Sequence, residues 1–164
     1  MKLKEQNGEH PLGDAGQLIV FGVFMVIWIL DSFILQHSTF LANSIPLVIR
    51  LIMLGAAFAA AFYLFKSGHV VVSGDQRATE VLSTGAFRYV RHPLYLGSIL
   101  IYFGMTVSTA SLFCLALLVL IALFYNYIAG YEEKLLEVKW GQDYIAYMKK
   151  TGKWVPHLGK KGYQ

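Results

Sequence analysis

The chemically richest segment of the 164-residue chain lies in its middle and has the sequence LSTGAFRYVRHPLYLG, residues 82–97. It combines two arginines, a histidine and two tyrosines: Arg88, Tyr89, Arg91, His92 and Tyr95. Pro93 favours a helix start directly after this cluster, because the first turn needs no N–H from that position. The free N–H groups of a helix start attract an anion such as a carboxylate. The segment is therefore typical of a polar binding site, although the arginines alone would also suit lipid headgroups and His92 a helix cap.

A second group of charged residues follows the last apolar segment of the chain. Glu132 and Glu133 stand there side by side, and an amphipathic stretch continues from them to Lys150. Two carboxylates at a membrane interface can hold a cation, and they can equally form a solvated helix end. The sequence thus predicts a polar pocket with a basic and an acidic side.

Four apolar segments must position these groups, at residues 17–35, 45–65, 91–107 and 112–131. One membrane-spanning helix needs about 20 apolar residues, so the third segment reaches that length only if its helix begins before Pro93. Residues 108–111 are expected to form a tight hairpin between the third and fourth segments. The expected fold is an all-α integral membrane protein with four transmembrane helices, a cytoplasmic loop and a C-terminal amphipathic helical segment, in one domain over residues 1–164.

The composition supports this fold class. The chain is 56% hydrophobic and 15% charged, whereas soluble domains are about 45–50% apolar and about 25% charged. The single cysteine, Cys114, excludes a disulfide scaffold and a Cys-based zinc site, and the scattered histidines predict no metal site. Three acidic residues among the first 16 argue against a cleaved signal peptide, so the first apolar segment is expected to stay as an anchor.

Basic residues predict the orientation in the membrane. Lysines and arginines occur before the first apolar segment, in the long loop at residues 66–92 and in the C-terminal tail, but not in residues 36–44 or 108–111. Because basic loops stay on the cytoplasmic side, a multi-pass protein with both termini in the cytoplasm is expected. The compact size favours a prokaryotic cytoplasmic membrane. The basic residues are interpreted as partners of anionic membrane lipids and not of nucleic acid.

Polar and small residues inside the first two segments carry further predictions. Asp31 and Arg50 lie at similar depth on either side of the first turn, so they are expected to pair unless each reaches water separately. The small residues of Gly55–Ala61 predict a face for close helix packing. Cys114 is interpreted as a buried, apolar thiol.

Two motifs resemble a known enzyme family. The sequence RHPLYLG at residues 91–97 resembles the RHPxYxG signature of the isoprenylcysteine carboxyl methyltransferase and phospholipid methyltransferase superfamily. The tail is similar to the closing pattern of these enzymes, with matching residues Glu132, Glu133, Gly141, Tyr144, Tyr147, Val155 and Pro156. The two motifs occur in the family's order and span residues 81–156, nearly half of the chain.

The resemblance implies a membrane methyltransferase that uses S-adenosylmethionine on a small hydrophobic or lipid-like acceptor, which is a carboxylate, a thiol or an amine. It places the cofactor region at residues 79–97 and 131–156, with the C-terminal segment closing the pocket. The cofactor contacts carried over by position are Thr79, Glu80, Val81, Leu82, Phe87, His92, Pro93, Leu94, Tyr95 and Glu132. The catalytic candidates are Glu132, which would hold the cationic cofactor, and Arg91, which would neutralise an anionic acceptor.

The chain departs from the family pattern at two positions. Phe87 stands where the family often has tyrosine, and Ile128 stands where carboxyl methyltransferases of prenylcysteine carry an arginine that engages the substrate. The cofactor half of the site therefore transfers better than the substrate half. Two alternatives stay open: an NADPH-binding protein similar to sterol reductases, which commonly have an acid where this chain has Ser98, and a non-catalytic four-helix protein that packs against a membrane partner.

Overall fold

The computed structural model describes residues 13–72, 81 and 83–157, and these residues are almost entirely helical. The elements are α2 (Gly13–Ile29), the π-helix η1 (Leu30–Leu35), the 3-10 helix η2 (Phe40–Asn43), α3 (Leu47–Val72), the 3-10 helix η4 (Gly85–Arg88), α4 (Pro93–Thr109), α5 (Leu112–Trp140) and α6 (Gln142–Lys150). Within the described residues the only β-type pairing is an isolated bridge between Val90 and Gly152. The prediction of an all-helical protein is confirmed.

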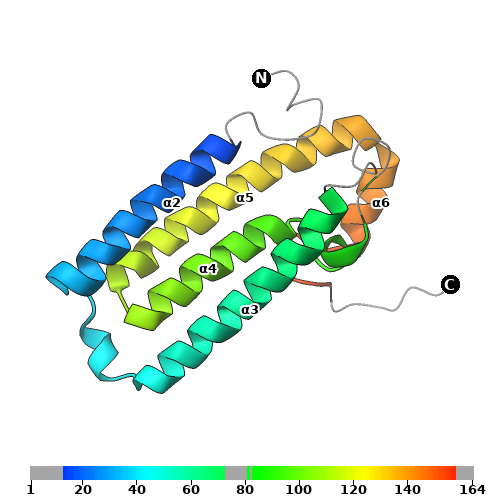
Figure 1. Cartoon of the computed structure of the whole chain (residues 1–164). Helices are drawn as coiled ribbons and strands as arrows, with labels where there is room; N and C mark the ends of the chain where they lie inside the picture. The colour runs from blue at the N-terminus through cyan, green and yellow to red at the C-terminus, as the bar shows by residue number, and fades with distance from the viewer. Residues whose placement is uncertain (1–12, 73–80, 82, 158–164) are drawn as a thin grey trace.

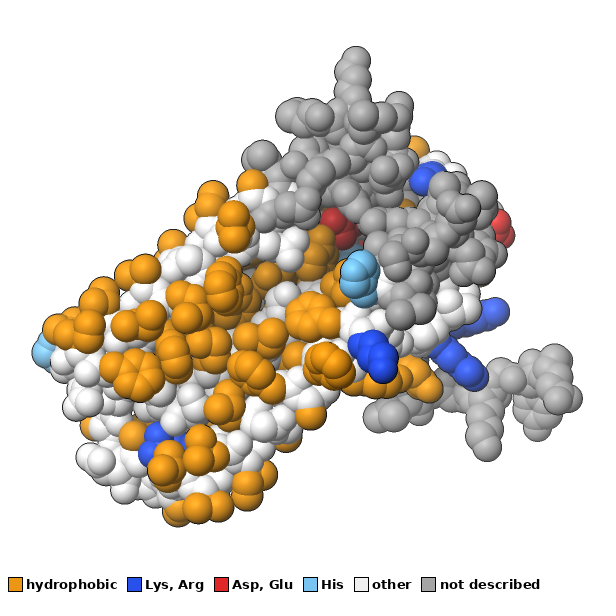
Figure 2. Space-filling model, viewed as in Figure 1, with side chains coloured by type: hydrophobic (Ala, Val, Ile, Leu, Met, Phe, Trp, Pro, Cys, Tyr) orange, Lys and Arg blue, Asp and Glu red, His pale blue; other side chains and the backbone are white. Residues whose placement is uncertain are grey.

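The four long helices lie side by side in the order α2, α5, α4, α3, and α6 turns across the end of α5 (Figure 1). A core forms where α2, α4 and α5 meet, and its buried members are Phe24, Tyr102, Cys114, Leu118, Ile121 and Tyr125. Cys114 is fully buried there, as predicted. Hydrophobic side chains cover much of the long body of the bundle, whereas most charged side chains in view lie at the end near α6 (Figure 2).

In the part of the chain that the structure describes, three helical stretches are long and apolar enough to cross a membrane: Ala15–Leu35, Leu47–His69 and Leu112–Trp140. The third expected span, residues 91–107, corresponds to α4, a shorter apolar helix of 17 residues. This helix begins at Pro93, two residues later than predicted, because a residue that precedes proline is disfavoured in the α conformation. His92 accordingly lies outside the α-helical region, with φ −125° and ψ 63°.

The last long helix runs further than the sequence predicted. Helix α5 has 29 residues and continues nine residues past the expected end at Tyr131. No glycine or proline interrupts residues 132–140, which are mostly good helix formers. The helix ends at Gly141, whose φ of 55° lies in the left-handed region that glycine tolerates and permits the turn into α6.

Small residues allow α3 and α4 to approach closely. A Cβ atom on Gly104 would lie 3.1 Å from Cβ of Ala57, and one on Gly97 would lie 3.4 Å from the carbonyl oxygen of Ala61. Both alanines are buried. The packing face predicted from Gly55–Ala61 is confirmed, with glycines of α4 as its partners.

The predicted pair between Asp31 and Arg50 is wrong. Asp31 is buried and accepts hydrogen bonds from the Ser38 N–H (3.1 Å) and from the hydroxyls of Ser38 and Ser111 (2.5 Å each). Arg50 donates instead to the carbonyl oxygen of Ser108 at 2.6 Å. Similar depth did not bring the two charges together, because the α2–α3 connection and the α4–α5 turn meet at this end of the bundle and supply polar groups to each of them.

These separate partners predict that exchanging the two charges will not restore stability. Asp31→Asn is expected to lower the free energy of unfolding by about 1.5–3 kcal/mol, because hydrogen bonds to a charged group are lost. The double variant Asp31→Arg, Arg50→Asp should melt no higher in detergent than the weaker single variant. A melting temperature above that of both single variants would show that the two residues interact after all.

Candidate functional site

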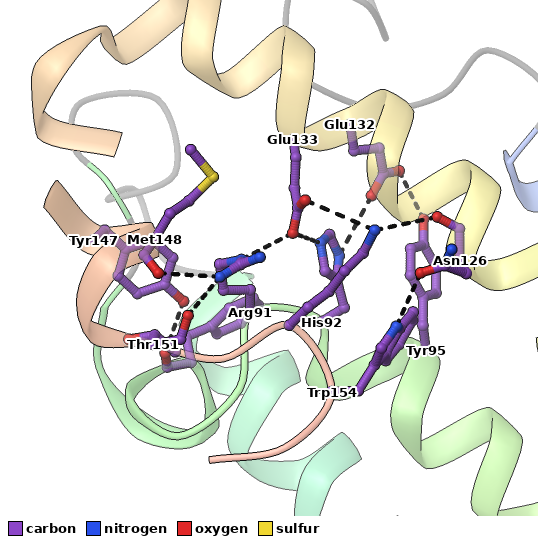
Figure 3. A network of polar contacts seen from close by, with 12 residues as sticks. Arg91, His92, Tyr95, Asn126, Glu132, Glu133, Tyr147, Met148, Thr151 and Trp154 are labelled. Carbon is purple, nitrogen blue, oxygen red and sulfur yellow. Dashed lines mark hydrogen bonds and ion pairs between the residues drawn. The ribbon is translucent and has the colours of Figure 1, made fainter. Parts of the chain in front are cut away.

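The polar residues singled out by the sequence meet where α4 begins, beside the second half of α5. Arg91 and His92 lie in the connection that leads into α4, Tyr95 lies in its first turn, and Glu132 and Glu133 face them from α5 (Figure 3). The prediction that these two groups share one site agrees with this arrangement.

The two adjacent carboxylates have different surroundings. Glu133 contacts cations, with Oε1 2.8 Å from Nε of Arg91 and Oε2 3.7 Å from Nζ of Lys153. Glu132 accepts a hydrogen bond from the Tyr95 hydroxyl at 2.7 Å. The His92 ring lies between them, with Nε2 3.1 Å from Glu133 and Nδ1 3.9 Å from Glu132. The site therefore has a Glu133 side that is neutralised by Arg91 and Lys153, and a Glu132 side that is lined by rings.

The rings of His92 and Tyr95 lie beside Glu132, and two further aromatic rings pack against them. The rings of His92 and Tyr95 are nearly parallel, 5.7 Å apart with 6° between their planes. The Trp154 ring lies 5.8 Å from the His92 ring, and the Tyr125 ring lies 5.3 Å from the Tyr95 ring. A carboxylate beside the rings of aromatic residues is an environment that suits a cation.

Arg91 ties the C-terminal strap, residues 151–155, to the site. Its Nη1 donates to the carbonyl oxygens of Met148 (3.2 Å) and Thr151 (2.5 Å), and its backbone N–H donates to the carbonyl oxygen of Gly152 (2.9 Å). With the contact to Glu133, the side chain joins α5, α6 and the strap. The structure thus places this residue against protein groups, whereas the sequence had suggested an anionic acceptor as its partner.

Helix α6, which has two buried tyrosines, is joined to the loop before α4 through Tyr147. The Tyr147 hydroxyl donates to the carbonyl oxygen of Phe87 at 2.7 Å, and the Tyr144 ring lies 5.8 Å from the Tyr147 ring. Burial raises the pKa of both tyrosine hydroxyls above their ordinary value. Both therefore remain protonated at neutral pH, and Tyr147 can keep its role as a donor.

Three residues of the site were missed by the sequence analysis. The Trp154 indole N–H donates to Oδ1 of Asn126 (3.1 Å), and Nζ of Lys153 donates to the carbonyl oxygen of Asn126 (3.2 Å). A lone asparagine in the apolar run of α5 was the available signal. Nothing local marked Lys153 among the many tail lysines, because its contacts depend on how the strap folds back.

The structure describes four of the other predicted cofactor residues. Pro93 is buried at the start of α4, and Leu94 packs toward α3, where a Cβ on Gly68 would lie 2.9 Å from its Cδ2. Phe87 contributes its carbonyl group to the contact with α6, and Val81 is half-buried. Thr79, Glu80 and Leu82 lie outside the described residues.

The strap leaves no room for a side chain at Gly152. A Cβ atom there would lie 1.8 Å from the carbonyl oxygen of Val155. Gly152→Ala is therefore expected to open the strap and to lower the free energy of unfolding by about 1–3 kcal/mol, the usual cost of overpacking. Trypsin cleavage after Lys153 should become several-fold faster.

The matched control is Gly55→Ala, since a Cβ on Gly55 would meet no atom within 4 Å. Equal cleavage rates for the two variants would contradict the closed strap.

Residues 45–143 match the phospholipid methyltransferase family. The chain belongs to this family. The resemblance predicted from the two motifs is confirmed, and the matched residues include the whole of α3, α4 and α5, with both glutamates. The strap lies beyond the matched residues.

Two relatives align over nearly the whole of this phospholipid methyltransferase family member. The cobalt-zinc-cadmium resistance protein CzcN of Cupriavidus metallidurans is 30% identical over 159 residues, which cover 91% of this chain and 72% of the relative. The methanethiol S-methyltransferase of Crocosphaera subtropica is 29% identical over 169 residues, which cover 93% of this chain and 55% of the relative. The chain therefore spans about half the length of the second relative. Among the residues that the structure describes, no group of three or more His, Cys, Asp or Glu side chains is placed to hold a metal ion.

Proposed function

We propose that the protein is an integral membrane methyltransferase that uses S-adenosylmethionine and acts on a small, hydrophobic thiol. The observation that carries the proposal is the Glu132 carboxylate, set among aromatic rings at the start of α4. In this proposal α4 is the third of four membrane spans, and both termini lie in the cytoplasm, because the basic segments share that side.

The residues of the site fit the chemistry of this cofactor. S-adenosylmethionine carries a cationic sulfonium and an ammonium group, and when bound it supplies an electrophilic methyl group. Glu132 provides negative charge for such a cation, and the rings of Tyr95 and Trp154 add cation–π attraction. The first turn of α4 offers free N–H groups to the carboxylate of the cofactor, since the His92 side chain makes no capping hydrogen bond there.

Each residue has a separate task in this proposal. Glu132 binds the cationic part of the cofactor, and the Tyr95 hydroxyl fixes the orientation of its carboxylate. Arg91 is a positioning residue, because its Nε and Nη1 already donate to Glu133 and the strap. The chain contributes mainly alignment of the reacting groups, which is worth about 7–11 kcal/mol in well-oriented reactions. The remaining contacts carried over from the family, at residues 79–82, 87, 93 and 94, belong to the same proposal.

Two observations favour a thiol among the acceptors that the sequence left open. One relative is named for S-methylation of methanethiol. In addition, Ile128 is fully buried at the position where carboxyl methyltransferases of prenylcysteine carry an arginine. This position therefore supplies no positive charge that could bind the carboxylate of an acceptor.

Calorimetric titration with S-adenosylhomocysteine tests the proposal on the purified, full-length protein. We expect saturable binding of one molecule per chain, and methyl transfer from labelled S-adenosylmethionine to an alkanethiol in the same preparation. NADPH in a parallel titration tests the alternative that resembles sterol reductases. Absence of S-adenosylhomocysteine binding by protein that unfolds cooperatively on heating would overturn the proposal.

A further inference from the structure

A groove lies on the membrane side of the candidate cofactor site, between α2, α4 and α5. It has a volume of about 380 Å³ and is lined by Gln17, Leu18, Phe21, Ser98, Tyr102 and Tyr125. At about 30 Å³ for each water-sized group, this volume holds roughly a dozen non-hydrogen atoms. The groove therefore suits a small molecule or the head of a longer one.

One aromatic ring separates the groove from the carboxylate. Tyr125 lines the groove, its ring lies 5.3 Å from that of Tyr95, and the Tyr95 hydroxyl donates to Glu132. Ser98 reaches the groove from one turn further along α4 than Tyr95. A molecule in the groove is thus next to the place where the proposed cofactor presents its cation.

The lining of the groove favours uncharged molecules over charged ones. None of the six residues is ionised at neutral pH, and the polar groups are the hydroxyls of Ser98, Tyr102 and Tyr125 and the amide of Gln17. Leu18 and Phe21 supply an apolar wall. A carboxylate or an ammonium group would lose its hydration in the groove without gaining a counter-charge, which is costly. A neutral acceptor with an apolar tail does not lose hydration free energy in this way.

We infer that this groove binds the methyl acceptor and restricts it to small, uncharged thiols, an inference that rests on the proposed function. The apolar tail lies along Leu18 and Phe21, and the sulfur points toward Tyr125 and Tyr95. In the reaction the acceptor sulfur forms a bond to the methyl carbon. The bond from that carbon to the cofactor sulfur would break with its electron pair staying on that sulfur, and the thiol proton would leave to solvent water.

Filling the groove tests the inference. Leu18→Trp narrows it from α2, and Ser98→Phe narrows it from α4, while neither changes a residue assigned to the cofactor. Both variants are expected to raise the KM for hexanethiol at least tenfold and to leave the Kd for S-adenosylhomocysteine unchanged. Val119→Trp is the matched control, because Val119 is exposed on α5 outside the groove lining, and its KM should equal that of the wild type.

The choice of acceptor gives a second readout that needs no variant. Wild-type kcat/KM for mercaptoacetate, which carries a carboxylate, should be at least 100-fold below that for a neutral thiol of similar size. Unchanged KM values in both groove variants, or equal kcat/KM for charged and neutral thiols, would overturn the inference and leave the proposed function standing. Failure of the wild type to bind S-adenosylhomocysteine would instead overturn both.

Discussion

Glu132→Gln is expected to weaken binding of S-adenosylmethionine by about 10- to 100-fold. A glutamine keeps the shape of the side chain and can still accept the Tyr95 hydrogen bond. It removes the negative charge, and a hydrogen bond to a charged group is worth about 1.5–3 kcal/mol. Titration calorimetry with S-adenosylmethionine and with S-adenosylhomocysteine measures the loss for each ligand. The loss should be larger for S-adenosylmethionine, because only its sulfur is positively charged.

The matched control for this prediction is Glu137→Gln. Glu137 lies on the same helix, five residues further on, and is exposed. The Glu137→Gln variant should bind both ligands with the affinity of the wild type. An equal loss of affinity for both ligands in Glu132→Gln would contradict a direct contact between this carboxylate and the sulfonium.

The second large effect is expected from Arg91→Ala, which should lower the free energy of unfolding by about 3 kcal/mol. The side chains of Arg91 and Glu133 are 12% and 15% exposed, so their ion pair is largely removed from water. Without the guanidinium, the carbonyl groups of Met148 and Thr151 also lose a donor. Thermal unfolding in detergent measures the loss, and faster trypsin cleavage after Lys153 reports release of the strap.

Two further variants separate the parts of this effect. Arg91→Lys keeps the charge but loses the planar, multiple donors, so it should fall between the wild type and Arg91→Ala. Arg88→Ala is the control, because Arg88 is exposed in the same loop. If Arg88→Ala destabilises the protein as much as Arg91→Ala does, the contacts of Arg91 do not hold the strap as described.

The sequence was sufficient for the parts of the fold that depend on apolar length and on small residues. Three apolar segments predicted the helices that are long enough to cross a membrane. The alanines of α3 predicted its packing face, and Gly97 and Gly104 of α4 complete it. Residues 91–97 and the pair Glu132 and Glu133 were predicted to form one polar pocket, because the basic segments place both groups at the same membrane surface. The family resemblance then identified this pocket as a cofactor region.

Contacts set by rotation and by long-range folding could not be predicted. Asp31 and Arg50 both reach the turn at residues 108–111, but a similar position along the helices does not say which way a side chain points, and serines of two turns became the partners of Asp31. The position of Trp154 beside His92 depends on the end of α5 at Gly141 and on the strap folding back. Each of these steps is local, but only their sum places the tryptophan in the site.

The length of α5 has a consequence for where the acceptor and the cofactor come from. Its 29 residues extend about 44 Å at 1.5 Å per residue, whereas the hydrocarbon layer is about 30 Å thick. Glu132 lies 20 residues from the first residue of this helix, close to the boundary of that layer, and Tyr125 lies two turns deeper. Within the proposed function, the acceptor is therefore taken from the lipid and the cofactor from the water, so the rate follows the mole fraction of acceptor in the bilayer. Adding empty lipid vesicles at a constant amount of thiol then slows methylation, because the added lipid dilutes the thiol within the bilayer.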